Sequence, residues 1–347
     1  MTAVRGATLS DVAAAAGVDA STASRVLNDE TGHRVGAATR QRVLDCAKAL
    51  GYQPNPLARG LRTSRSYTLG IAVPQLENPV FPEIILGAER AARERGYSLL
   101  ISHSDDAGGD ARNYEHLVRV SRVDGLLVAT LEDEELLGRS LARTSVPFVV
   151  LNRKLEGVEN HVVFDSFAAA RLAAEHLLSL GHRRIAHLAG RERGYNGIRR
   201  LAGYRAALEA AGIAFDPDLV AAAGYTFEGG ELAMRELLMR RNHPTAIVAA
   251  TLLAAAGALK ALHAENIRVP AQMSIVGIHD TALADMLHPP LTTVRLPLQE
   301  MGASATRGLI DLIEGKSKRV AQTLPPDRLV LRGSTAPRRV RTRAAGK

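Results

Sequence analysis

Arg25 lies near the end of a short segment whose outward positions otherwise hold small residues, namely Ala20, Ser21 and Ser24. Small polar residues and one arginine on an exposed short helix suit the major groove of DNA, where an arginine can bind guanine O6 and N7 with two hydrogen bonds. This pattern favours recognition of bases in double-stranded DNA. The alternative is an ordinary pair of surface helices.

Two short helices that pivot on Gly17 would position these residues. The first begins near Leu9 behind a capping box of Thr8 and Asp11, and its apolar stripe at helical spacing consists of Leu9, Val12, Ala13 and Ala16. Asp19 or Ser21 can cap the second helix, whose inner face is formed by Ala23, Val26 and Leu27. Residues 8–28 therefore predict a helix-turn-helix.

A third helix and a short fourth one follow. Gly51 ends the third helix, whose inward residues we expect to be Val43, Leu44, Ala47 and Leu50. Asn55 and Pro56 begin a helix of about two turns, which is too short to be stable alone in water. This segment is either a flexible linker or a hinge helix that orders on DNA beside its dimer mate, with Leu61 inserted in the minor groove.

From Tyr67 onward, short apolar strands alternate with helices, which predicts parallel sheets built from βαβ units. The expected strands are 67–73, 98–102, 125–129, 147–151, 162–164, 185–188, 219–222, 246–249, 275–278, 293–296, 320–324 and 329–331. The expected helices are 81–95, 111–119, 134–141, 167–180, 198–211, 228–239, 252–264 and 298–314. We expect these elements to form two similar lobes. The last elements, within residues 293–331, are expected to pass back between the lobes.

Composition restricts the class of protein. A formal net charge of +8 over 347 residues favours a polyanionic partner, and residues 1–66 hold nine basic against five acidic side chains. No apolar run is long enough to span a bilayer and no signal peptide is recognisable, so we expect a cytoplasmic protein without membrane contact. The single Cys46 excludes an internal disulfide, and we expect it to pack in a helix.

Patterns for catalysis and metal binding are weak. The sequence has no phosphate-binding glycine loop followed by lysine, no nucleophile elbow and no His-Glu-x-x-His motif, so we expect neither an enzyme nor a cofactor. His176, His182 and His187 fall on a helix, a loop and a strand, and they need not converge. We therefore expect no metal site.

Eight motifs in order along the chain resemble the LacI family of bacterial transcription regulators, which includes the lactose and purine repressors. They are Thr8-Leu-Ser-Asp-Val-Ala, Ser24-Arg-Val-Leu-Asn28, Gly51-Tyr-Gln-Pro-Asn55, Glu77-Asn-Pro-Val-Phe81, Arg122-Val-Asp-Gly125, the run from Glu175 to Ile185, Arg200-Leu-Ala-Gly-Tyr204 and Pro289-Pro-Leu-Thr-Thr-Val294. The resemblance implies an α/β chain with an all-α helix-turn-helix headpiece, a hinge helix, and a two-lobed core with parallel sheets like periplasmic binding proteins. It also implies a homodimeric repressor that binds a palindromic operator with a central CG step, and a small-molecule effector between the lobes.

The resemblance divides the chain into regions. Residues 1–54 are the expected DNA-binding domain, 55–66 the hinge helix or linker, and 67–336 the core for effector binding and dimerisation. Within the core we expect an N-lobe of about 67–164 and 295–323 and a C-lobe of about 165–294 and 324–336. Residues 337–347 are expected to be a disordered basic tail, since they hold five basic side chains and no acid.

The resemblance also assigns residues to the DNA. The base-reading positions fall on Ala20, Ser21 and Arg25, and the phosphate contacts on Thr22, Ser24, Asn28 and Thr39. The other expected DNA contacts are Thr8, Arg34, Asn55, Ala58, Leu61 and Arg62. Because Ala20 is smaller than the residue often found there, we expect Arg25 to carry most of the direct readout.

The expected effector cleft departs from the family pattern. Its matching positions are Val80, Phe81, Asn152, Arg153, Asp165, Asn196, Arg200, Tyr225, Leu252 and Asp280. Family members that bind sugars or purines usually have Asn-Asp where this chain has Thr251-Leu252, Asn152 replaces a frequent aspartate, and the usual Gly-Phe-Asp-Asp reads Gly277-Ile-His-Asp280. The cleft has thus lost carboxylates and kept an arginine.

Two hypotheses follow for this cleft. In the first, the effector, a sugar, sugar acid or other small metabolite, is less hydroxylated or anionic, with its charge against Arg200 and its apolar part on Phe81 or Tyr225. In the second, the cleft binds no metabolite, and the regulator is controlled by its amount or by a protein partner. Induction and co-repression both fit the sequence. A transport binding protein is the alternative for the core alone, but such a protein carries an export signal and no headpiece.

Overall fold

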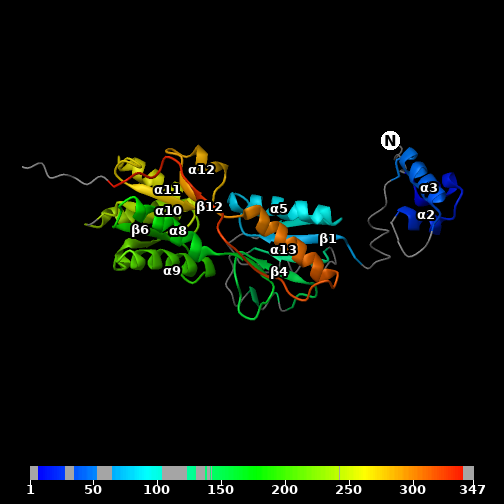
Figure 1. Ribbon diagram of the computed structural model, residues 1–347, viewed down its shortest axis with the longest axis horizontal. Coiled ribbons are helices and arrows are strands. Elements are labelled where there is room, and N and C mark those ends of the chain that lie inside the picture. The colour runs from blue at the N-terminus through cyan, green and yellow to red at the C-terminus, as the bar shows by residue number, and fades with distance from the viewer. Residues whose placement is uncertain are drawn as a thin grey trace, which may run out of the picture. The chain divides into compact units, whose positions relative to one another are not determined.

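The computed structural model describes residues 7–27, 35–52, 65–103, 123–129, 137–138, 141, 143–241 and 243–338. The chain divides into two compact units, Met1–Tyr67 and Thr68–Lys347 (Figure 1). Each unit contains its own cluster of buried apolar side chains. Among the described residues, none of the helices combines the length and the apolar character needed to cross a lipid bilayer.

The N-terminal unit contains α1 (Leu9–Ala16), α2 (Ala20–Leu27) and α3 (Ala37–Ala49). The predicted capping box is present, because Thr8 Oγ1 accepts the backbone N–H of Asp11 at 3.3 Å and the Asp11 carboxylate accepts the backbone N–H of Thr8 at 2.7 Å. Gly17 ends α1 in the left-handed region, with φ at 62°, which favours glycine. The shared core consists of Val12, Ala13, Ala16, Ala23, Val26, Val43 and Ala47. The predicted helix-turn-helix is therefore confirmed.

The prediction for the inner face of α3 was wrong at two positions. Leu44 is 39% exposed and Leu50 is 42% exposed, whereas Val43 and Ala47 are buried. Cys46 packs against the same core as Val43. Residues 43, 46 and 47 lie on one side of a helix with 3.6 residues per turn, and residue 44 lies about 100° away from residue 43. Within the described residues, α1 and α2 pack on the side of α3 that holds Val43 and Ala47.

The C-terminal unit contains two six-stranded sheets, which we call the N-lobe and C-lobe sheets. The N-lobe sheet has the order β11-β5-β4-β3-β1-β2, and the C-lobe sheet has the order β12-β10-β9-β8-β6-β7. The strands of the N-lobe sheet are β1 (Thr68–Val73), β2 (Ser98–His103), β3 (Gly125–Val128), β4 (Phe148–Leu151), β5 (His161–Phe164) and β11 (Ala321–Leu324). Those of the C-lobe sheet are β6 (Ile185–Ala189), β7 (Val220–Ala222), β8 (Ala246–Ala249), β9 (Ser274–Ile278), β10 (Thr292–Arg295) and β12 (Arg328–Val330).

The described strand pairs are parallel, as predicted, with one exception. β12 runs antiparallel to β10, with Val294 opposite Leu329. The reason is the chain path: β11 belongs to the other sheet, and the short return through residues 325–327 brings β12 back along β10 in the opposite direction. Strands β1, β3, β4, β5, β8 and β9 are buried along most of their length, which is typical of parallel strands covered on both faces.

Helices pack in pairs on these sheets. The N-lobe pair is α5 (Val80–Glu94) with α13 (Leu298–Ile313), and the C-lobe pairs are α8 (Ser166–Ser179) with α9 (Tyr195–Ala210) and α10 (Phe227–Met239) with α11 (Leu252–Ala264). Figure 1 shows the two C-lobe pairs on opposite faces of their sheet. The sequence did not predict α12 (Ala282–Met286) or the 3-10 turn η1 (Pro217–Leu219). The predicted helix 111–119 and most of 134–141 lie outside the described residues.

Glycines allow the N-lobe pair to approach closely. A Cβ atom built on Gly302 of α13 would lie 2.0 Å from the carbonyl oxygen of Ile84, and one on Gly87 of α5 would lie 1.9 Å from the carbonyl oxygen of Gln299. Real Cβ atoms do not come so close to backbone. The α5–α13 contact therefore requires glycine at both positions.

The chain crosses between the two sheets three times. The crossings are Asp165 between β5 and α8, residues 296–297 between β10 and α13, and residues 325–327 between β11 and β12. They lie beside one another, because the N–H of Asp165 donates to the carbonyl of Leu324 at 2.8 Å and the N–H of Asp327 donates to that of Arg295 at 2.9 Å. Three short adjacent crossings are typical of a hinge between two lobes. We call these three crossings the hinge, as distinct from the expected hinge helix of residues 55–66.

Candidate functional site

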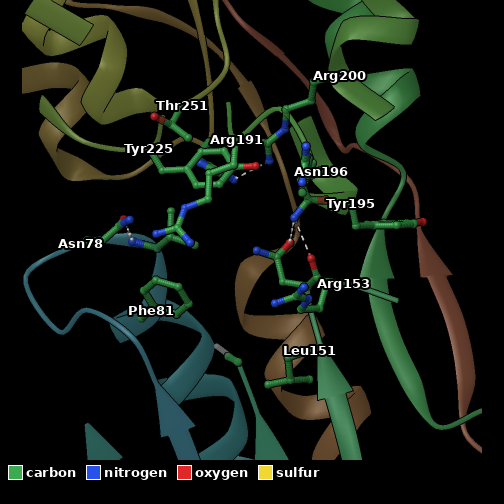
Figure 2. A pocket seen from close by; sticks show the side chains of 16 residues that line it. Asn78, Phe81, Leu151, Arg153, Arg191, Tyr195, Asn196, Arg200, Tyr225 and Thr251 are labelled. Atoms are coloured by element: carbon green, nitrogen blue, oxygen red, sulfur yellow. Dashed lines mark hydrogen bonds between the residues drawn. The ribbon is translucent and has the colours of Figure 1, made fainter. Parts of the chain in front are cut away.

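A pocket of about 300 Å³ lies between the N-lobe and C-lobe sheets, at the carboxyl ends of their parallel strands. Its lining follows β1, β3 and β4 of one sheet and β6, β7, β8 and β9 of the other, and consists of Asn78, Val80, Phe81, Ala129, Leu151, Asn152, Arg153, Arg191, Arg193, Gly194, Tyr195, Asn196, Arg200, Tyr225, Thr251 and His279. Figure 2 shows Phe81 and Leu151 on one side and Tyr225, Thr251 and Arg200 on the other. Open α/β sheets bind ligands at such an edge.

Seven of the ten residues predicted for the effector cleft line this pocket: Val80, Phe81, Asn152, Arg153, Asn196, Arg200 and Tyr225. Three do not line it. Leu252 is 1% exposed and belongs to the C-lobe core. Asp165 caps α8 by accepting the N–H of Ala168 at 3.0 Å, and it lies 3.8 Å from Arg199.

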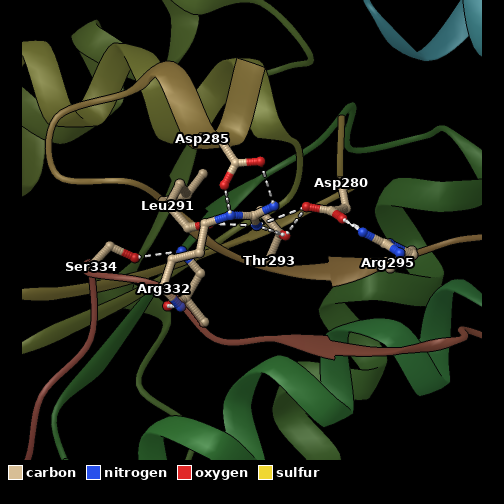
Figure 3. A network of polar contacts seen from close by, with 8 residues as sticks. Asp280, Asp285, Leu291, Thr293, Arg295, Arg332 and Ser334 are labelled. Carbon is tan, nitrogen blue, oxygen red and sulfur yellow. Dashed lines mark hydrogen bonds and ion pairs between the residues drawn. The ribbon is translucent and has the colours of Figure 1, made fainter. Parts of the chain in front are cut away.

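Asp280, the third, belongs to a polar network beside the hinge (Figure 3). Its carboxylate accepts hydrogen bonds of 2.7 Å from Thr293 Oγ1 and from Arg295 Nε, and lies 2.7 Å from Arg332 Nη1. Burial by itself would raise the pKa of Asp280, but the hydrogen bonds from Thr293, Arg295 and Arg332 outweigh it and hold the pKa below its usual range. Arg332 also contacts Asp285, whose Oδ1 lies 2.6 Å from Arg332 Nε.

Sequence reasoning missed nine lining residues, and in two cases it missed by one position. Thr251 lines the pocket where Leu252 was predicted, and His279 where Asp280 was predicted. Thr251 is the N-cap of α11 and His279 directly follows β9, whereas Leu252 is the first residue of α11 and turns into the core. Choosing the residue that directly follows the strand would have found His279 but not Thr251, because Ala250 stands between β8 and Thr251. The others are Asn78, Ala129, Leu151, Arg191, Arg193, Gly194 and Tyr195.

Arg200 is the most deeply buried charged residue of this pocket, with 1% of its surface exposed. Its Nη1 donates to the carbonyl of Ala250, and its Nη2 lies 3.2 Å from Nε2 of His279. Burial lowers the pKa of Arg200, and it lowers the pKa of His279 strongly, with Arg200 as a second cause. His279 is therefore neutral beside a charged arginine.

A hydrogen bond joins the two walls of the pocket. Asn196 of α9 donates from Nδ2 to the carbonyl of Asn152 at 2.6 Å and to its Oδ1 at 3.1 Å, and Ser166 donates to Asn196 Oδ1 at 2.8 Å. Asn152 and His279 both have positive φ values, 60° and 78°, although neither is glycine. Such strained backbone is concentrated at ligand sites and switch regions. The pocket thus lies where the lobes touch and where the backbone is constrained.

The three histidines singled out in the sequence have separate hydrogen-bond partners. His176 Nε2 lies 3.1 Å from Thr335 Oγ1, and His182 Nε2 lies 3.1 Å from Ser274 Oγ. His187 is fully buried and stacks on Tyr204, and burial lowers its pKa to about 4. In the part of the chain that the structure describes, no group of histidine, cysteine and carboxylate side chains has the arrangement of a metal site.

The predicted DNA-contacting residues that the structure describes lie on the helix-turn-helix unit. Ala20 and Ser21 are exposed on α2, and Thr22, Ser24 and Arg25 of the same helix are half-buried. Thr8 caps α1, and Thr39 lies in the first turn of α3. Asn28, Arg34, Asn55, Ala58, Leu61 and Arg62 lie outside the described residues.

Asp19 organises the start of α2. Its carboxylate accepts the backbone N–H of Thr22 at 2.8 Å and the hydroxyl hydrogens of Ser21 at 2.5 Å and Thr22 at 2.7 Å. These hydrogen bonds, led by the one from Ser21, lower the pKa of Asp19 far below its usual range. Since the hydroxyl hydrogen of Ser21 is already used, the side chain presents acceptor lone pairs outward.

Comparison with known proteins places both units in one family. Residues 8–55 match the family of bacterial regulatory proteins of the lacI type, and residues 174–335 match the periplasmic binding protein-like domain. The chain is 37% identical over 335 residues to the transcriptional regulator CelR of Thermobifida fusca, with 93% of this chain and 95% of CelR covered.

Solved structures show the same similarity. A CelR–cellobiose complex has a TM-score of 0.73 and 34% identity, covering 94% of this chain and 99% of that one. A lac repressor dimer bound to operator and to the anti-inducer ONPF has a TM-score of 0.79 and 30% identity, covering 96% of this chain and 100% of that one. These relatives are transcriptional regulators and not enzymes. The chain therefore belongs to the LacI family of bacterial transcriptional regulators.

Proposed function

We propose that this regulator is a repressor that binds a palindromic operator as a homodimer, and that a small molecule in the pocket sets its affinity for DNA. The observation that carries the proposal is the position of the pocket. Both sheets line it, the hydrogen bond from Asn196 to Asn152 crosses it, and three adjacent crossings connect the sheets beside it. A ligand that contacts both walls changes the relative free energies of their open and closed arrangements.

The DNA-reading part of the proposal rests on α2. We assign the main base contact to Arg25 and a weaker one to Ser21, whose hydroxyl can accept a hydrogen bond from the amino group of adenine or cytosine because Asp19 takes its hydrogen. We expect Thr22, Ser24 and Thr39 to contact phosphates. Two copies of this unit would read the two half-sites of the operator.

The segment of residues 55–66 provides the proposed link between the two units. If it forms a helix only beside the same segment of a second copy, its stability depends on the distance between the two cores. Closure or opening of the lobes about the three crossings changes that distance. Leu61 would then enter or leave the minor groove, and affinity for the operator would change with it.

Fluorescence anisotropy with the full-length protein tests the proposal. The probe is a labelled duplex from the region upstream of its own gene, and the competitor is a scrambled duplex of equal length. We expect the upstream duplex to bind at least 1000-fold more tightly than the scrambled one. Metabolites made by the products of neighbouring genes should change that affinity by about 5- to 150-fold. Equal affinity for both duplexes would refute operator recognition, and an affinity that no metabolite alters would refute effector control.

A further inference from the structure

The pocket between the N-lobe and C-lobe sheets has an unusual balance of charge. Four of its sixteen lining residues are arginines, namely Arg153, Arg191, Arg193 and Arg200, and none of those sixteen is an aspartate or a glutamate. Ligand pockets usually have an apolar lining with a few polar groups that fix orientation and specificity. Here the charged groups of the described lining all have the same sign.

Two carboxylates that were predicted for this cleft, those of Asp165 and Asp280, contact arginines outside the lining. Asp165 caps α8 and lies 3.8 Å from Arg199, which does not line the pocket. Asp280 contacts Arg295 and Arg332 in the network beside the hinge. Neither carboxylate lines the pocket, and the described contacts of both are with groups outside the lining.

Arg200 shows this imbalance most directly. It is 1% exposed, its two described hydrogen bonds go to the carbonyl of Ala250 and to neutral His279, and its Nε has no partner within the described residues. A guanidinium removed from water and left without a carboxylate is costly, and a nearby negative charge would reduce that cost. The protein thus has a buried positive charge that an anionic ligand can compensate.

The N-terminus of α9 adds a second source of positive potential. Gly194, Tyr195 and Asn196, the N-cap and first two residues of this helix, all line the pocket. No side chain caps α9, whereas Asp165 caps α8, Thr226 caps α10 and Thr251 caps α11. The backbone N–H groups at a helix N-terminus and the helix dipole attract anions.

The two walls of the pocket differ in polarity. On the N-lobe wall four lining residues are apolar: Val80, Phe81, Ala129 and Leu151. The C-lobe wall holds three of the four arginines, the N-terminus of α9, and Thr251 with His279. A ligand that satisfies both walls has a charged end and a carbon skeleton on the opposite side.

We infer that the pocket binds a small organic anion, with its carboxylate or phosphate group against the C-lobe wall and its carbon skeleton against Val80, Phe81 and Leu151. This inference rests on the proposed control by an effector and specifies the chemistry of that effector. It differs from the neutral disaccharide in the CelR–cellobiose complex. A volume of about 300 Å³ suits a compound of the size of a substituted monosaccharide.

Matched pairs of compounds test the sign of the charge. Full-length protein is melted at constant ionic strength with neutral hexoses, the corresponding hexuronates and the corresponding hexose 6-phosphates, and with benzoate and benzamide as an apolar pair. Compounds that raise the melting temperature are then titrated by calorimetry, since stabilisation follows from binding to the folded state. We expect the charged members to bind at least tenfold more tightly than their neutral partners, and to bind more weakly at high salt. Comparison of the uronates with the phosphate esters identifies the anionic group.

Two arginine variants test where the anionic group of the ligand binds in the pocket. Arg193 lines the pocket and is exposed, so R193Q is expected to fold normally and to weaken binding of the anion about three- to tenfold. Arg171 of α8 is exposed, pairs with Glu175 and lies outside the lining, so R171Q serves as the control with unchanged binding. Equal losses in both variants would overturn the assignment.

The remaining outcomes separate this inference from the proposed function. If only neutral sugars bind and they change operator affinity, the inference of an anionic ligand is refuted and the proposed effector control is retained. A panel in which nothing binds, with operator affinity unchanged throughout, would refute both. An anion that binds in the pocket without changing operator affinity would support the chemistry and refute control of DNA binding.

Discussion

Replacing Asp280 by asparagine should destabilise the C-lobe much more than the same change at Asp285. Both carboxylates contact Arg332, but the Asp280 side chain is 3% exposed and that of Asp285 is 68% exposed. Removing the charge of Asp280 leaves the guanidinium of Arg332, itself 10% exposed, without its buried partner. Breaking a buried ion pair in this way costs about 3–5 kcal/mol, and losing an exposed one costs about 0–1 kcal/mol.

Thermal unfolding of D280N and D285N measures this difference. For a chain of this size 1 kcal/mol shifts the melting temperature by about 2–4 °C, so D280N should melt about 6–20 °C lower than wild type and D285N within about 4 °C of it. Equal shifts, or a larger shift for D285N, would refute the assignment of the buried pair. Urea unfolding of both variants checks that the slope with denaturant, and hence the unfolded state, has not changed.

The pH dependence provides a second test of the same pair. The contacts of Asp280 hold its pKa below the usual value of an aspartate, so the folded state favours the ionised form. The stabilisation is therefore fully present above the pKa of the unfolded state, about 3.9, and is lost as the pH falls through the folded pKa. The difference in stability between wild type and D280N should be constant near neutral pH and shrink below about pH 4. A difference that persists at acid pH would contradict the role of charge.

Three further changes test other parts of the molecule. Arg25→Ala should relax the base preference at one position of each half-site and cost about 1–3 kcal/mol of operator affinity, and an unchanged preference in a binding-site selection would contradict it. Gly302→Ala should lower the N-lobe melting temperature, because its Cβ would lie 2.0 Å from the carbonyl oxygen of Ile84, and a calorimetric scan with no shift would show that the helices separate at little cost. Asn196→Ala removes the hydrogen bonds to Asn152 that join the walls, so small-angle scattering should show a larger radius of gyration without ligand, and identical curves would argue that this contact does not hold the lobes together.

The sequence predicted much of this fold because its buried strands are short apolar runs separated by helices. Strand β8 and helix α11 have the predicted bounds, and most other elements differ from prediction by one to three residues. The antiparallel β12 was not predicted because strand direction depends on the path of the chain between sheets, which local apolar pattern does not contain. The exposure of Leu44 and Leu50 depends on how many helices surround α3, which the pattern within α3 does not reveal.

The pocket could be predicted in outline and not in detail. The resemblance to the LacI family identified Phe81, Asn152 and Arg200, all of which line the pocket. The loop after β6 was missed, although Arg191 and Arg193 stand in it, because a charged loop looks the same whether it faces solvent or a cleft. The position of Asp280 depended on Arg332, a residue far away in the sequence that no local pattern connects to it.

The three crossings between the sheets also determine the order in which the lobes can fold during synthesis. The N-lobe sheet needs β11 beside β5, and α13 packs against β3, β4 and β5. Both elements follow the C-lobe strands β6 to β10 in the chain, so the ribosome must add the stretch between β5 and α13, which takes on the order of ten seconds, before the N-lobe can be completed. During that interval the apolar surface that α13 later covers is open to water. We therefore expect chaperones to bind the nascent N-lobe until α13 has been made, although β1 to β5 are the first strands to be synthesised.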